Sequence, residues 1–123
     1  MLVNNPRLGA ALAATLGTNT THPSFPLHTV VLQRGHGFIT VGKSVEHVVD
    51  FACYTTSNAR VQTKALLLTG VVGGGVQYLS ERERRDTRNM NAWIVFKPWR
   101  QWVWEVERSG GYVNELGTPP LGA

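Results

Sequence analysis

The sequence predicts a mixed fold of the α/β (α+β) class, in which antiparallel strands are combined with long helices. One indication is the stretch 29–41, where two short apolar runs are separated by a glycine-containing turn, as in a hairpin. Another is the segment 44–68, which keeps an apolar stripe at helical spacing and contains neither glycine nor proline. A third is the run S-E-R-E that begins at Ser80, because this pattern is a capping box that starts a helix.

The N-terminal part is predicted to form a short helix over residues 6–16. Asn5 followed by Pro6 is an N-cap with proline at the first helical position, and the leucines that follow share one face. Gly17 ends the helix, and a loop rich in threonine and proline follows to residue 27. An amphipathic helix explains this apolar stretch better than a signal peptide does, so we expect a cytoplasmic protein.

The predicted hairpin carries the most distinctive residue of the chain at its turn. His36 lies between Gly35 and Gly37, and these glycines remove the Cβ atoms that would crowd the imidazole and permit a positive φ. Such a supporting turn suits a histidine that must project toward a ligand. From residue types alone, the favoured interpretation is a turn histidine that faces water, with the glycines present only for the turn.

Three helices are predicted after the hairpin. The first runs over 44–68, with Ser44 as its cap and Glu46 in its first turn, and a glycine-rich connector follows at 70–75. The second spans 80–96 and the third spans 99–108, because Pro98 must break or kink the chain between Phe96 and Trp99. A short strand is expected near 112–114, and residues 115–123 read as an irregular tail.

The four tryptophans are concentrated in these last helices. Trp99 and Trp102 share one helical face with Val103 and Val106, whereas Trp104 points elsewhere. This is more aromatic surface than a small core needs, so we expect the face to be buried against the sheet or against a subunit partner.

Composition limits the function classes. With 123 residues, 42% hydrophobic residues and 16% charged residues, the chain is predicted to be one globular domain. The net charge is +4, but the basic residues do not interleave with aromatics, and the run 81–86 alternates in sign, so no nucleic-acid partner is expected. No apolar run approaches the length of a membrane span. Cys53 cannot form an intrachain disulfide and is predicted to be a small buried hydrophobe.

The sequence also resembles a known family. The motif L-x-x-G-H-G-x-x-x-x-G-K-S over residues 32–44, followed by a long helix, resembles the C-terminal half of the class II aldolase/adducin family. The run from Tyr78 to Trp93 and the pair Pro98–Trp99 are similar to fungal members. The resemblance covers residues 6–114.

This resemblance implies a single three-layer α/β/α domain around an antiparallel sheet, assembled as a homotetramer with active sites between subunits. It implies a metal-dependent aldehyde-lyase of carbohydrate metabolism that cleaves a C–C bond of a phosphorylated sugar by a retro-aldol reaction. It assigns His36 as one of three histidines that hold Zn²⁺ or another divalent cation, which stabilises the enediolate as a Lewis acid. Adducins retain the domain and lack the chemistry.

The chain departs from the family pattern at the metal site. The family takes its other two ligands from an H-x-H pair in the first half of the domain, and this sequence has no such pair. His22, His28 and His47 do not match ligand positions, and His47 is expected to face water. We therefore expect a fragment of a longer parent that is inactive and metal-free alone. A non-catalytic adducin-like interaction domain is the alternative, and the substrate stays unidentified.

Overall fold

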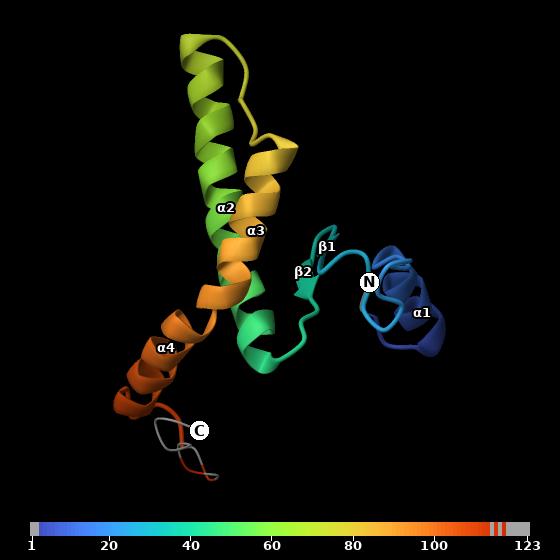
Figure 1. Ribbon diagram of the computed structural model, residues 1–123, viewed down its shortest axis with the longest axis vertical. Helices are drawn as coiled ribbons and strands as arrows, with labels where there is room; N and C mark the ends of the chain where they lie inside the picture. The colour runs from blue at the N-terminus through green and yellow to red at the C-terminus, as the bar shows by residue number, and fades with distance from the viewer. Residues whose placement is uncertain (1–2, 114, 116, 118–123) are drawn as a thin grey trace. The chain divides into compact units, whose positions relative to one another are not determined.

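The computed structural model describes residues 3–113, 115 and 117, and the chain divides into two compact units, Met1–Tyr78 and Leu79–Ala123. The first unit contains helix α1 (Pro6–Thr15), the strands β1 (Val30–Gln33) and β2 (Gly37–Thr40), and helix α2 (Val45–Val72). The second contains α3 (Glu81–Ile94) and α4 (Phe96–Arg108). Figure 1 shows these elements in chain order. The coarse prediction of a mixed helix-and-strand fold is therefore confirmed.

Helix α1 begins as its sequence predicts. The Asn5 side chain accepts a hydrogen bond from the Leu8 amide at 3.0 Å, and Pro6 occupies the first turn, where its missing N–H leaves no bond unmade. The following loop is tied back to the helix, because the His28 amide donates to the Leu16 carbonyl at 2.8 Å. The loop therefore leads the chain from α1 into β1.

The two strands form the predicted antiparallel hairpin, which is the whole sheet within the described residues. Val31 pairs with Ile39 and Leu32 with Phe38, so the strands are in register directly up to the turn. A further bond from the Val41 amide to the Thr29 carbonyl, at 2.8 Å, extends the ladder beyond the strand ends. A turn of three residues, 34–36, connects the strands.

Helix α2 starts at the predicted cap and ends later than predicted. The Ser44 side chain accepts from the His47 amide, and the helix continues through Gly70 to Val72, where Gly73 adopts a φ of 76°. The predicted end at residue 68 was thus wrong. An exposed glycine inside a helix costs only about 1 kcal/mol relative to alanine, which the residues on both sides of Gly70 can offset.

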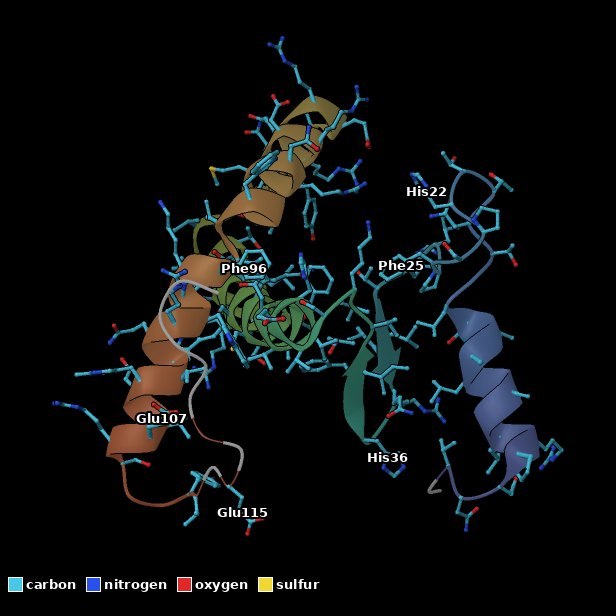
Figure 2. The ribbon with its side chains drawn as sticks, turned by 60° about the horizontal axis from the view of Figure 1, so that its bottom comes forward. His22, Phe25, His36, Phe96, Glu107 and Glu115 are labelled. Carbon is cyan, nitrogen blue, oxygen red and sulfur yellow. The ribbon has the colours of Figure 1, made fainter. Side chains whose placement is uncertain are left out.

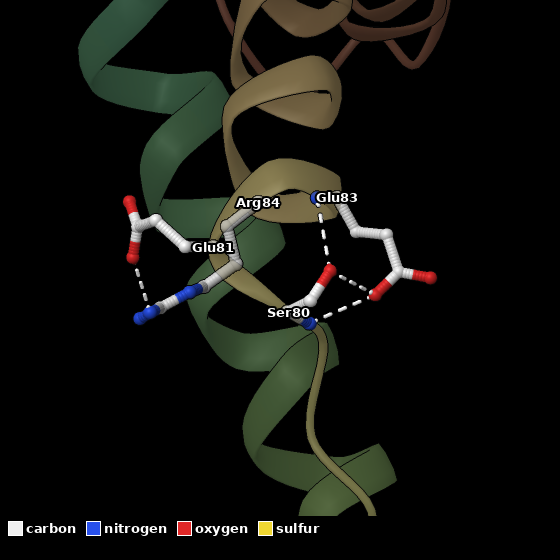
Figure 3. Close-up of polar contacts among 4 residues, drawn as sticks. All are labelled: Ser80, Glu81, Glu83 and Arg84. Carbon is white, nitrogen blue, oxygen red and sulfur yellow. Dashed lines mark hydrogen bonds and ion pairs between the residues drawn. The ribbon is translucent and has the colours of Figure 1, made fainter.

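Helix α3 begins with the predicted capping box, drawn in Figure 3. The Ser80 hydroxyl accepts from the Glu83 amide at 3.3 Å, and the Glu83 carboxylate accepts from the Ser80 amide at 2.8 Å. These hydrogen bonds from Ser80 lower the pKa of Glu83. Glu81 also pairs with Arg84 across one turn, and residues 81–90 are all exposed, so the charged run is a solvated face.

The predicted break at Pro98 occurs, but nearer the N-terminus. Helix α3 ends at Ile94, Val95 separates the helices, and Pro98 lies in the first turn of α4. Proline disrupts the bond to the carbonyl four residues earlier, which here belongs to Ile94, so the interruption falls before Phe96 and not after it. The predicted helix end at residue 96 and the predicted helix start at residue 99 were therefore both wrong, because Pro98 disrupts the helix at Ile94.

Few side chains are fully buried. Among the described residues, Val95 is the one buried apolar side chain and Asp50 the one buried polar side chain. Cys53 is exposed, which corrects its predicted burial, because it lies on an uncovered face of α2. Tyr112 and Val113 are exposed and form no strand, and residue 114 lies outside the described residues. Many apolar side chains of α2 are also exposed, so this chain needs further surface to complete a core.

The tryptophan face of α4 is only partly buried. Trp99, Trp102 and Val103 are half-buried and Val106 is exposed, so the predicted burial of this face is only partial, and its packing against the sheet or a subunit partner stays a prediction. Trp104 lies apart as predicted, and the Arg108 guanidinium stacks over its ring at 4.5 Å. None of the described helices is long and apolar enough to cross a lipid bilayer.

Candidate functional site

His36 lies at the end of the hairpin. Its amide donates to the Gln33 carbonyl at 3.0 Å, which closes the turn, and its side chain is exposed. The flanking Gly35 and Gly37 have φ values of 79° and 104°, a region that other residues rarely adopt. Figure 2 shows the imidazole beyond the tips of the two strands. The structure thus places the ring where a ligand from outside the hairpin can reach it.

The other histidines lie in different surroundings. His22 and His28 are exposed loop residues, and the His22 amide donates to the Asn19 side chain at 3.0 Å. His47 is half-buried on the first turn of α2, with its Nδ1 2.9 Å from the Ser44 hydroxyl. The prediction that His47 faces water was therefore wrong. Its ring contacts the Ser44 cap of α2 and the ring of Phe51, which lies edge-on to it, and these contacts cover part of the imidazole.

The residues present do not make up a zinc site. Zinc requires three or four protein ligands. Within residues 3–113, 115 and 117, no three His, Cys, Asp or Glu side chains gather closely enough to hold a metal ion. His36 can therefore supply one ligand at most, and the remaining ligands would have to come from other residues.

The start of α2 positions the hairpin. The Thr40 hydroxyl donates to the Val48 carbonyl at 3.2 Å, and Gly42 lies so close to α2 that an added Cβ would meet the Val48 amide nitrogen at 2.9 Å. Hydrogen bonding to the Ser44 hydroxyl lowers the pKa of Glu46, which suits a carboxylate in the first helical turn. These contacts link the strand that follows His36 to a capped helix.

Buried next to this joint is an acidic residue. Asp50 is 5% exposed, and burial raises the pKa of its carboxyl, while the charge of His47 acts in the opposite direction. A buried carboxyl with a raised pKa is a common feature of functional sites, although structural carboxyls show the same shift. Asp50 lies on α2, whereas His36 lies on the turn of the hairpin, so the two residues belong to different elements.

A groove lies beside this joint, between the hairpin and the middle of α2. Its volume is about 480 Å³. Leu32 and Phe38 form the hairpin wall, and these two residues pair across the strands one step from the turn that contains His36. The helix wall consists of Thr55, Thr56, Ala59, Arg60, Thr63 and Lys64. The sequence pattern did not predict this groove, although it contains one signal: Arg60 and Lys64 are the only charged residues between positions 51 and 80.

Comparison with known proteins gives one partial relative. The chain is 37% identical over 120 residues to the decarboxylase tropJ of Talaromyces stipitatus. The match includes 93% of this chain and 45% of the relative, so the chain spans less than half the length of the curated protein that it matches. No protein-family model matches the chain, and no solved structure matches it. The chain is therefore a partial homologue of a decarboxylase.

Proposed function

We propose that the chain is part of a lyase that cleaves a C–C bond of an organic acid by decarboxylation. The observation that carries this proposal is the 37% identity to the decarboxylase tropJ over nearly the whole chain. Because that match covers 45% of the relative, the proposal concerns the activity to which these residues contribute.

The chemistry agrees with the resemblance to class II aldolases. In decarboxylation the bond between a carbon and its carboxylate breaks, CO₂ leaves, and the electron pair stays on the carbon until it forms a C–H bond with a proton. Retro-aldol cleavage also breaks a C–C bond and leaves an electron pair that an adjacent carbonyl delocalises. One type of site, which stabilises the resulting enolate, serves both reactions. The motif over residues 32–44 supports this view, as does the expectation of a three-layer α/β/α domain.

In this proposal His36 supplies one imidazole to the site. Zn²⁺ or another divalent cation would act there as a Lewis acid, with its other ligands provided by residues besides His36. The turn between Gly35 and Gly37 presents the imidazole, and the contacts of Thr40 and Gly42 with α2 fix the direction of the hairpin. A homotetramer with sites between subunits, in the cytoplasm, remains part of the proposal.

Two alternatives have specific support. Retro-aldol cleavage of a sugar or sugar phosphate is favoured by the motif over residues 32–44. A non-catalytic, adducin-like interaction domain is favoured by the exposed apolar side chains of α2 and α4. Neither alternative requires a nucleic acid or a membrane as a partner.

A product assay separates these functions. The native assembly is incubated with a panel of aromatic and 3-oxo carboxylic acids and, separately, with ketose phosphates. Release of CO₂ from an acid supports decarboxylation, whereas an aldehyde trapped from a ketose phosphate supports aldol cleavage. An assembly that contains the expected divalent metal but forms neither product would support the interaction domain and contradict both lyase proposals.

A further inference from the structure

The charged helix α3 lies outside the proposed lyase site. It belongs to the second unit of the chain, whereas the hairpin that carries His36 belongs to the first. Residues 81–90 of α3 are all exposed, and the ion pairs of this run, Glu81–Arg84 and Arg82–Asp86, stay within the helix. The surface of this helix is therefore open to a second macromolecule.

Thr87, in the middle of α3, has a free hydroxyl group. It is exposed, and no hydrogen bond joins its hydroxyl to another residue that the structure describes. Most helical threonines of this chain differ from it, because their hydroxyls donate to a carbonyl one turn earlier: Thr15, Thr56, Thr63 and Thr69. The Thr87 oxygen is therefore available as a nucleophile without the loss of an intrahelical hydrogen bond.

The residues before Thr87 form a recognition pattern. Arg84 and Arg85 lie three and two positions before it, and no other serine or threonine of the sequence follows two arginines in this way. Protein kinases choose their acceptors by such charge patterns, and carboxylates in a substrate groove bind guanidinium groups at these two positions. Arg85 forms no ion pair with a described residue, and the exposed pair of Arg84 with Glu81 contributes little, so both guanidinium groups are available.

Helix α3 must open locally before a kinase can bind the residues around Thr87 in an extended conformation. The helix has 14 residues, a length at which an isolated helix is marginal in water. Its residues 81–90 bury no side chain, and the capping box at Ser80 holds its first turn. A segment with so few packing contacts opens at a low free energy, so the extended form is accessible.

We infer that Thr87 is a phosphorylation site for a protein kinase that selects arginines two and three residues before the acceptor. In this step Oγ1 of Thr87 attacks the γ-phosphorus of ATP, and a new P–O bond forms. The bond from this phosphorus to the β–γ bridging oxygen breaks, ADP leaves with the electron pair, and a kinase aspartate accepts the hydroxyl proton.

Phosphorylation would reverse the charge of this helix surface. Residues 81–90 contain four arginines and three acidic residues, so their formal net charge is +1. A phosphate adds about −1.5 to −2 charges near neutral pH, which makes the run net negative. Arg84 lies one turn before Thr87, so its guanidinium can leave Glu81 and bind the phosphate.

The test measures phosphate transfer to the native assembly. The assembly is incubated with ATP and the catalytic subunit of cyclic-AMP-dependent protein kinase, which selects arginines at these two positions, and the phosphorylated residues are located by mass spectrometry. We expect phosphate on Thr87 and none at this position in Thr87→Ala. Arg84→Gln/Arg85→Gln should lower kcat/KM by at least about tenfold, because the charge-assisted hydrogen bonds to the kinase are lost. The control Arg60→Gln/Lys64→Gln removes the same charge from α2 and should not change the rate.

A second variant tests the opening of α3. Ser80→Ala removes the helix cap and leaves the arginines in place, so Thr87 should be phosphorylated about fivefold faster. The control Ser24→Ala changes an exposed loop serine and should have no effect. Absence of phosphate on Thr87 in the native assembly would overturn the inference, as would a rate that Arg84→Gln/Arg85→Gln does not change. A rate that Ser80→Ala does not raise would refute the opening step, and with it the route by which the kinase reaches Thr87.

Discussion

Substituting Gly42 by alanine tests how the hairpin is held on α2. An added Cβ would lie 2.9 Å from the Val48 amide nitrogen and 3.0 Å from both His47 Cβ and Val48 Cγ2. The first of these atoms belongs to the helix backbone, so a side-chain rotation cannot relieve the contact. The hairpin must therefore move away from α2, which strains the bond from the Thr40 hydroxyl to the Val48 carbonyl.

The expected cost follows from this overpacking. Inserting one methyl group into a closely packed site destabilises a protein by about 1–3 kcal/mol. Amide hydrogen exchange in the hairpin should then quicken by roughly 5- to 150-fold, with the Val41 amide, which donates to the Thr29 carbonyl, as the main reporter. Because Gly42 links α2 to the strand after His36, the same change should disturb the position of His36.

The matched control is Gly70→Ala. Gly70 is a glycine inside α2 with no atom within 4 Å of an added Cβ, so alanine should stabilise the helix by about 1 kcal/mol. The two identical substitutions should thus have opposite signs. If Gly42→Ala leaves hairpin exchange unchanged, or stabilises it as Gly70→Ala does, the close approach of hairpin and helix is refuted.

Two further predictions concern α3–α4 and the buried carboxyl. Pro98→Ala restores an amide donor to the Ile94 carbonyl and removes a penalty of about 3 kcal/mol on a continuous helix. The distance between spin labels at Arg85 and Glu105 should therefore change toward the roughly 30 Å expected for a straight helix. An unchanged distance would show that packing, and not Pro98, causes the interruption. Burial raises the pKa of Asp50 above its unfolded value, so its favourable contribution is present below about pH 4 and is lost as the pH rises. Asp50→Asn should therefore raise Tm near neutral pH and leave it unchanged near about pH 3, and a lower Tm at neutral pH would contradict this reasoning.

Local chemistry made several elements predictable. Asn5, Ser44 and Ser80 cap the helices that follow them, because each cap depends on a side chain and an amide three residues away. The hairpin was predictable for the same reason, since its two apolar runs and the Gly35 turn are contiguous. The class of the fold followed from these signals.

The wrong predictions concerned features that depend on residues several positions away in the sequence or on contacts between elements. The effect of Pro98 was assigned to the residues beside it, although proline acts on the carbonyl four residues earlier. Gly70 suggested a helix end, but single glycines are tolerated within helices. The half-burial of His47 and the exposure of Cys53 depend on which face of α2 is covered, which periodicity alone could not establish.

The candidate site was only partly predictable. The glycines around His36 indicated a projecting histidine, and the structure places it at an exposed turn. The groove combines Leu32 and Phe38 from the hairpin with residues of α2 that lie 17 to 32 positions further along, so it exists only once the hairpin packs on the helix. The sequence alone shows Arg60 and Lys64, but it does not show that Leu32 and Phe38 lie opposite this part of α2.

The most direct test of the proposed function is the effect of His36 on CO₂ release. The native assembly, His36→Ala and the control His22→Ala, which alters another exposed histidine, are compared with the same carboxylic acid substrate. We expect His36→Ala to lose at least about a hundredfold in rate together with bound divalent metal, while His22→Ala retains both. Full activity and full metal content in His36→Ala would contradict the role of this histidine and, with it, the proposed site.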